Sequence, residues 1–353
     1  MAAEEEMKKY FRFAANFRAA VIFPFAFCVA FFAESCSSSG ENVGANVVLD
    51  NVELNKTSCA VVIPKGKTAT VDVADGSYWD KIVFEGSVEE WRGVFVQNRK
   101  IILSAFCMGQ YPVTQELFEK VMGYNPCLFK NEIPGESTAL RAADTISWFE
   151  GIVFCNKLTQ ATMKDSDCVY YANSSCKKVY GEDDMKKRAV PFFNQKKKGW
   201  RLPTETEWEY AARGGIENFD KRNFAFSGTA SADGKIVLDR KGNVFTDANL
   251  NDYGWYRANS NKSTHEVGLK KPNALGLYDM TGNVWEWIYD WLDHHIAEGT
   301  VKNPIGPETG ADRCLRGGSW FDNAYDCVLC RRFHNAHPGI GHSYFGFRVC
   351  RSL

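Results

Sequence analysis

The C-terminal part of the chain gathers side chains that could bind a metal ion or react. Three of the six histidines, His334, His337 and His342, lie within nine residues, and Cys327 and Cys330 are three positions apart. Imidazole suits iron and copper, and thiolates suit Cu(I). The histidines nevertheless lack the HxH or HxxxH spacing, with a carboxylate partner, that a facial iron site would use. Their spacing alone therefore does not predict a catalytic metal centre.

The same region, residues 321–344 (FDNAYDCVLCRRFHNAHPGIGHSY), has an unusual composition. It contains no Lys, Glu, Gln, Met or Trp, although these types occur throughout the rest of the chain. An AAC codon whose two adenines are randomised encodes every residue type that is present and none of these five. A loop that avoids the five types by chance is the alternative. The aromatic and small polar residues that remain are typical of recognition loops, so the segment predicts a binding surface.

Few regular elements are available to position this segment. Residues 106–114 predict a strand, and Thr114 can cap a helix that runs to residue 122. The stretches 147–150 and 204–207 have capping-box spacing before apolar runs, which predicts two further helix starts. Loops rich in Gly, Asn, Asp and Trp follow. We therefore expect an α+β fold with two main helices, short antiparallel strands and extensive loops.

The N-terminal part predicts export and a division into domains. Residues 1–36 resemble a signal peptide, with an apolar stretch at 19–33 and Cys36 followed by a polar linker, so Cys36 is the expected lipidation site. A plain secretory signal with an incidental cysteine is the alternative. Residues 37–91 alternate short β-rich runs with turn residues and predict a small β-rich module or spacer. Residues 92–353 form the main domain. We expect an extracytoplasmic protein, lipid-anchored at the outer membrane or cell surface.

Export would permit disulfides among the twelve cysteines. Cys168 and Cys176 flank a short polar loop and could close it, and Cys314 and Cys350 bracket the C-terminal region. Connectivity is left open. The net charge of −1 and the lack of a basic stripe argue against a nucleic-acid partner.

Five ordered motifs resemble the formylglycine-generating-enzyme (sulfatase-modifying factor) family, which implies a C-type-lectin fold of that family's subtype. The motifs are YPVT (111–114), TISW (145–148), WRLPTETEWEYAARGG (200–215), NALGLYDMTGNVWEW (273–287) and RGGSW (316–320) with FGFR (345–348). In related enzymes, positions matching Asp279, Gly282, Val284 and Glu286 hold a structural calcium ion through oxygen ligands. The alternative is that the two carboxylates only bind the loop backbone.

The resemblance also implies what is missing for catalysis. The family's copper-dependent oxidation uses two cysteines, five residues apart, after the Gly-Gly-Ser strand. The second matches Cys327, whereas the first falls at Asp322. We therefore expect no catalytic residues and no catalytic cofactor. An altered oxidoreductase acting on protein cysteine, with Cys327 and Cys330 as its thiols, is the alternative, and an accessory domain with a fixed partner is a third.

The RGGSW and GFR flanks, together with the codon pattern, resemble the variable proteins of diversity-generating retroelements, in which adenine-directed mutagenesis rewrites the 3′ end of a gene. That resemblance implies a surface-displayed, non-catalytic protein that binds an unidentified protein or other macromolecule. The positions expected to act as scaffold are Trp320, Ala324, Cys327, Arg332, Pro338 and Phe345. The positions expected to vary and to contact the ligand are Phe321, Asp322, Asn323, Tyr325, Asp326, Val328, Leu329, Phe333, His334, Asn335, His337, Gly339, Ile340, His342, Ser343 and Tyr344.

Overall fold

The computed structural model describes residues 58–73, 93–215, 226–228, 250–333 and 336–353, with the backbone of four short strands in addition. Those strands form two pairs, β1 (Val48–Leu49) antiparallel to β2 (Val52–Glu53), and β4 (Ile82–Phe84) parallel to β8 (Ile236–Leu238). The expected signal peptide and Cys36 lie outside the described residues. Within the part of the chain that the structure describes, no helix is long and apolar enough to cross a bilayer.

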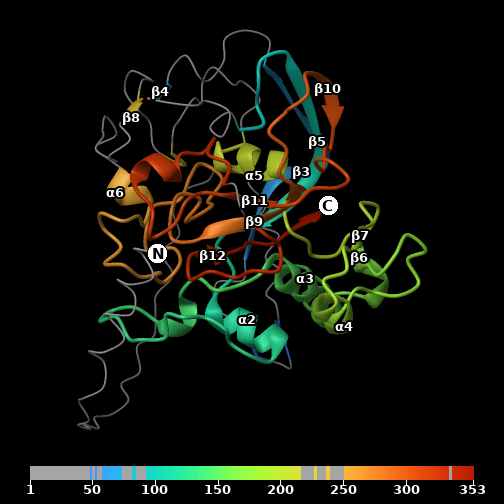
Figure 1. Ribbon diagram of the computed structural model, residues 1–353, viewed down its shortest axis with the longest axis horizontal. Coiled ribbons are helices and arrows are strands. Elements are labelled where there is room, and N and C mark those ends of the chain that lie inside the picture. The colour runs from blue at the N-terminus through green and yellow to red at the C-terminus, as the bar shows by residue number, and fades with distance from the viewer. Residues whose placement is uncertain are drawn as a thin grey trace. The chain divides into compact units, whose positions relative to one another are not determined.

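The larger sheet is organised around β5 (Arg99–Gly109), as Figure 1 shows. One edge of β5 pairs along its length with β3 (Cys59–Val73), antiparallel. The other edge pairs first with β10 (Gly299–Lys302) and then with β13 (Cys350–Ser352). Burial along β5 alternates in its first half, as expected for a strand with one face on the core.

Strand β3 differs from the sequence expectation in one respect. It was expected in a separate β-rich module at residues 37–91, yet it pairs with β5 from Cys59↔Gly109 to Val73↔Arg99. Its apolar residues Ala69, Val71 and Val73 are buried in the same core as the main domain. Local β propensity showed a strand here but carried no information on its pairing partner.

The smaller sheet carries the segment of interest. Its centre is β9 (Trp285–Trp291), all seven residues of which are buried. Strand β11 (Arg313–Arg316) pairs antiparallel on one side of β9, and β12 (Phe345–Gly346) pairs parallel on the other. Residues 321–344 therefore leave the sheet just after β11 and return to it at β12, so both ends are held by neighbours of one buried strand (Figure 1).

The helices begin where the caps were expected. Thr114 accepts a hydrogen bond from Leu117 N at the start of α2 (Gln115–Met122). Capping boxes formed with Ser147 and Thr204 open α3 (Trp148–Thr162) and α5 (Glu205–Ala212). The other elements are α4 (Glu182–Lys186), α6 (Leu250–Tyr253), the pair β6 (Tyr170–Tyr171) and β7 (Phe192–Phe193), and the 3-10 helices η3 (Thr138–Leu140), η4 (Asp165–Asp167) and η6 (Ala324–Cys327). The expected mixed α+β fold with few helices and short strands is confirmed.

The cysteines of the described residues are all free thiols, so neither suggested disulfide is present in this structure. Cys314 donates from its thiol to Glu205 Oε1 (2.9 Å), whereas Cys350 lies beside Arg201 Nη1 (3.0 Å). Sequence spacing alone could not show that these thiols face different partners.

Candidate ligand-binding face

A turn at two glycines precedes residues 321–344. Gly317 and Gly318 have φ values of 98° and 75°, in the region that favours glycine. A Cβ on Gly318 would overlap the side chain of Cys327. The turn and the buried Cys327 thiol therefore fit together and fix where the segment begins.

Fixed loops hold the backbone of the segment by hydrogen bonds. Arg257 N donates to Asp322 O (2.8 Å), Thr145 N to His342 O (2.9 Å) and Trp148 N to Pro338 O (3.1 Å). Near its end, the indole of Trp320 donates to Ser343 O (2.9 Å). The acceptors in these hydrogen bonds are backbone oxygens of the segment. The side chains at the accepting residues can therefore change while the hydrogen bonds remain.

The six expected scaffold positions are all buried, as a scaffold requires: Trp320, Ala324, Cys327, Arg332, Pro338 and Phe345. Arg332 has the strongest tie to the rest of the fold. Its guanidinium donates from Nε and Nη2 to both oxygens of Glu205 at the start of α5, at 2.6 and 2.7 Å. A bidentate pair of this kind fixes direction as well as position.

Part of the segment forms an exposed stack, which we call the aromatic ladder and define as His342, Tyr344, Phe321 and the guanidinium of Arg257. His342 and Tyr344 stack at 5.2 Å between ring centroids, and Tyr344 stacks on Phe321 at 5.8 Å. Arg257 Cζ lies 5.3 Å from the Phe321 ring centroid. Phe321 is 45% exposed, and Ile340 in the same segment is 46% exposed. The ladder thus offers rigid apolar area with a cation at one end.

Two of the positions expected to contact a ligand are placed in the core, and for them the expectation is wrong. Val328 and Leu329 are both 0% exposed and pack in the hydrophobic cluster that also holds residues of β3 and β5. The chain turns inward there after η6, so these side chains face the domain interior. Codon composition indicates which residues can occur, and it does not report the direction of a side chain.

Phe333 and Asp322 also point inward. Phe333 packs against Trp285 (5.1 Å) and Phe345 (5.7 Å). Asp322 accepts from Trp285 Nε1 (2.7 Å) and from the Ser319 hydroxyl, and burial raises the pKa of its carboxyl to about 6.

The remaining expected contact positions are at least partly exposed, apart from two that lie outside the described residues, His334 and Asn335. The exposed and half-buried positions are Phe321, Asn323, Tyr325, Asp326, His337, Gly339, Ile340, His342, Ser343 and Tyr344.

The two thiols of the enzymatic alternative lie in the protein interior. Cys327 and Cys330 are both fully buried, and burial raises the pKa of the Cys327 thiol well above its ordinary value. Asp322 occupies the position expected for the partner thiol. Thiolates are the reactive form of cysteine, so a buried neutral thiol is a poor nucleophile and copper ligand. Among the described residues, no three His, Cys, Asp or Glu side chains gather as a metal site would require.

Two of the four positions matched to a calcium site, Asp279 and Glu286, use their carboxylates to bind protein groups in this arrangement. Glu286 accepts from Arg348 Nε and Nη2 (both 2.6 Å) and from Trp208 Nε1 (2.7 Å), which occupies both carboxylate oxygens. Asp279 accepts from Gly268 N (2.7 Å), and burial raises the pKa of its carboxyl. The arrangement therefore follows the alternative, in which these carboxylates hold the protein itself together.

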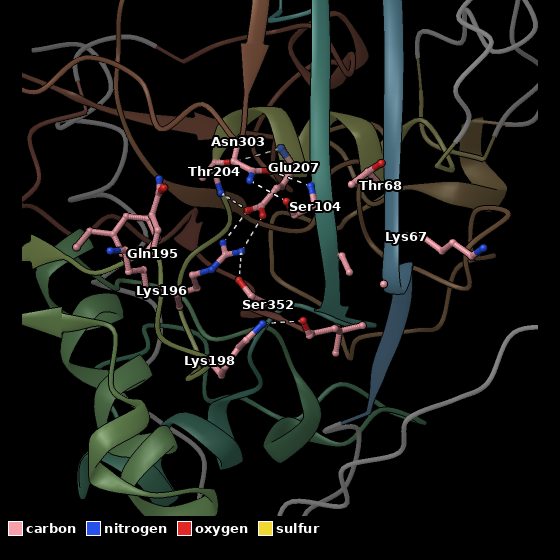
Figure 2. Close-up of a pocket in the computed structure, with 15 residues that line it drawn as sticks. Lys67, Thr68, Ser104, Gln195, Lys196, Lys198, Thr204, Glu207, Asn303 and Ser352 are labelled. Atoms are coloured by element: carbon pink, nitrogen blue, oxygen red, sulfur yellow. Dashed lines mark hydrogen bonds and ion pairs between the residues drawn. The ribbon is translucent and has the colours of Figure 1, made fainter.

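A cleft of about 550 Å³ lies elsewhere, between β3, β5, the loop before Trp200 and the last residues of the chain. Glu207 is held there by the buried Arg201 (2.6 and 2.7 Å), and Lys198 donates to Leu353 O (2.7 Å). In Figure 2 the side chain of Lys67 points away from Glu207. The cleft includes no residue of 321–344, and no sequence feature pointed to it.

Residues 47–353 match the family model described as the sulfatase-modifying factor enzyme 1-like domain. Among solved structures, Treponema denticola variable protein 1 has a TM-score of 0.61 and 30% sequence identity, and the match covers 84% of this chain and 99% of that one. The chaperone protein LppX of Paenibacillus barcinonensis is 31% identical over 279 residues, 77% of this chain and 89% of its own length. The formylglycine-generating enzyme of Mus musculus is 30% identical over 267 residues, 71% of this chain and 67% of its own.

Proposed function

This chain belongs to the family of sulfatase-modifying factor enzyme 1-like domains, and we propose that it is a surface-displayed binding protein of that family without catalytic activity. The resemblance to formylglycine-generating enzymes and that to a variable protein are both confirmed by the comparisons. The observation that carries the proposal is the aromatic ladder: exposed rings that stand on a backbone anchored by fixed residues.

The residues of the ladder are suited to binding because they offer a large contact area at a small loss of conformational entropy. Aromatic side chains give large contact area while losing few rotatable bonds, and antibody recognition loops use them for this reason. Small polar residues such as Asn323 and Ser343 add adaptable hydrogen bonds. An exposed apolar surface of this kind in a folded domain is typical of an interaction site.

The division of the segment into buried and exposed positions supports diversification by adenine-directed mutagenesis. All six scaffold positions are buried, and twelve of the fourteen expected variable positions that the structure describes are exposed or half-buried. A codon drawn from AAC never encodes Lys, Glu or Gln, so arginine is the one long polar side chain that can be drawn onto the face. We propose further that Cys36 carries the lipid that displays the domain outside the cytoplasm.

A randomised library tests this proposal at the protein level. Codons at Phe321, Asn323, Ile340, His342 and Tyr344 are replaced by NNC, and the full chain is displayed on phage and selected against a panel of unrelated proteins. A folded face built for variation yields binders to several targets. A control library at five cleft residues, Thr68, Ser104, Gln195, Asn303 and Ser352, yields none. Equal yields from the two libraries would remove the support for a dedicated face.

The enzymatic alternative has its own test. Copper titration and oxygen uptake are measured with a cysteine-bearing peptide, using the wild-type chain and Cys327→Ser. We expect no turnover with either protein. Oxygen uptake that depends on Cys327 would show that the chain is an oxidoreductase and not only a binding protein.

A further inference from the structure

Two arginines outside residues 321–344 lie directly against that segment. Arg257 stacks on Phe321 at one end of the aromatic ladder, with Cζ 5.3 Å from the ring centroid. Arg188, in the loop after α4, lies so close to Gly339 that a Cβ there would be 2.9 Å from Arg188 Nε. Both arginines have exposed side chains. They therefore stand on the proposed binding face without being part of its diversified sequence.

These two guanidinium groups differ from other arginines of the fold. Arg201, Arg316, Arg332 and Arg348 are buried, and each forms an ion pair with a glutamate. Arg188 and Arg257, in contrast, have no ion pair with any acidic side chain in the described ranges. Each keeps a planar set of donors that suits a carboxylate.

The acidic residues of the segment do not neutralise this charge. The Asp322 carboxylate is turned inward to Trp285 Nε1 and the Ser319 hydroxyl. Asp326 lies 3.6 Å from Arg331 Nε and is paired with that buried arginine. Each guanidinium lies beside a neutral residue of the segment, Arg257 beside Phe321 and Arg188 beside Gly339, next to the exposed Ile340.

We propose that Arg188 and Arg257 are fixed anion-recognising contacts of the binding face, and that the ligand is a protein surface presenting carboxylates beside apolar side chains. This inference rests on the proposed function. Complementary charge accelerates encounter and orients partners, whereas apolar contacts fix the bound complex. The fixed arginines then supply an attraction common to all sequence variants, and the drawn residues select among acidic partners.

The observations favour a protein over a nucleic acid. Proteins that bind single-stranded nucleic acids also use aromatic and cationic side chains. Their sites, however, are positively charged grooves that follow the phosphate backbone of the strand. Here each cation contacts the segment at a separate residue, Phe321 or Gly339, and the exposed side chains include the aliphatic Ile340. The chain as a whole has a net charge of −1. An acidic protein patch with an apolar centre matches this pattern better.

The test uses the full chain, with a random copolymer of L-glutamate and L-tyrosine immobilised as the probe, because it presents carboxylates beside aromatic rings. Variants Arg188→Glu, Arg257→Glu and the double variant are compared with Lys67→Glu, a matched charge reversal on the exposed bulge of β3. Binding is followed by biolayer interferometry at about 0.05 and 0.5 M salt, which changes the screening length several-fold. Thermal unfolding of each variant checks that it is folded.

We expect each arginine reversal to weaken binding about tenfold, because it places like charges together, and the double variant to weaken it further. Lys67→Glu is expected to change binding by less than about twofold, since exposed charges remote from a contact are screened. High salt weakens the wild type and not the double variant.

Three results would overturn the inference: no binding of the copolymer by the wild type, an equal loss in Lys67→Glu, or tighter binding of oligothymidylate than of the copolymer. A separate pair, Phe321→Ala and Tyr344→Ala, distinguishes the two proposals. If these weaken binding while the arginine variants do not, the face binds ligand and only the role of the arginines is wrong. If neither set has an effect, the proposed function fails as well.

Discussion

Leu329 and Ile340 are aliphatic residues of the same segment in opposite environments. Replacing each by asparagine tests whether a polar residue is tolerated at a buried position as well as at an exposed one. Leu329 is 0% exposed, in the core beneath η6, and Ile340 is 46% exposed. Leucine, isoleucine and asparagine are all residue types that a codon drawn from AAC can encode. The pair therefore separates burial from codon composition.

The magnitudes follow from the two environments. Removing most of a buried leucine side chain costs about 2–5 kcal/mol of unfolding free energy, and burying an amide without partners adds about 1–3 kcal/mol. Leu329→Asn is thus expected to lose about 4 kcal/mol, a large share of the stability of about 5–15 kcal/mol typical of a domain. Ile340→Asn is expected to change the unfolding free energy by about 0.5 kcal/mol or less, because the side chain that is replaced lies at the surface.

Urea unfolding followed by tryptophan fluorescence measures both variants against the wild type. Equal losses would refute the placement of Leu329 in the core. A loss confined to Leu329→Asn means that only apolar residues survive at that position, whatever the mutagenesis supplies. Selected variants would then differ mainly at the exposed positions.

Three further predictions concern buried charges of the fold and the positions matched to a calcium site. Burial, with the nearby Glu205 charge, raises the pKa of Asp290 to about 8, so the folded state holds a proton that the unfolded state has lost. Unfolding free energy should therefore fall as pH rises from about 4 to 8, and Asp290→Asn should flatten that slope in a pH series of urea melts. Arg332→Met should cost about 3 kcal/mol, since the buried Glu205 loses its bidentate partner and keeps only the longer ion pair with Arg316 Nη1 (3.3 Å), and the double variant with Glu205→Leu should recover much of that loss in the same assay. Removing calcium with EDTA should leave the melting temperature unchanged, because Arg348 already satisfies Glu286, and a fall reversed by added calcium would contradict this arrangement.

The sequence predicted the local elements well, because their signals are local. Thr114, Ser147 and Thr204 cap the helices as expected, since a cap depends on residues within one turn. Sequence analysis did not predict that β3 pairs with β5, because strand pairing depends on distant residues and on packing.

The sequence indicated which segment forms the candidate site, but it did not indicate every residue that belongs to the exposed face. The codon pattern found the segment, and the buried scaffold positions agree with it. Val328 and Leu329 were assigned to the surface from the codon composition of the segment, which does not show whether a side chain points into the core or toward solvent. Arg188 and Arg257 were missed because they lie far from the segment in sequence, and only the fold brings them to it.

The flanking DNA tests the central claim most directly. The gene and its neighbourhood are sequenced from many clones of one lineage, and codons 321–344 are compared among them. The account predicts a nearby near-copy of this segment with AAC at the variable positions, an adjacent reverse transcriptase gene, and differences among clones confined to those adenines. Absence of the near-copy, with substitutions spread equally over all bases of the segment, would contradict the account and leave a fixed binding domain.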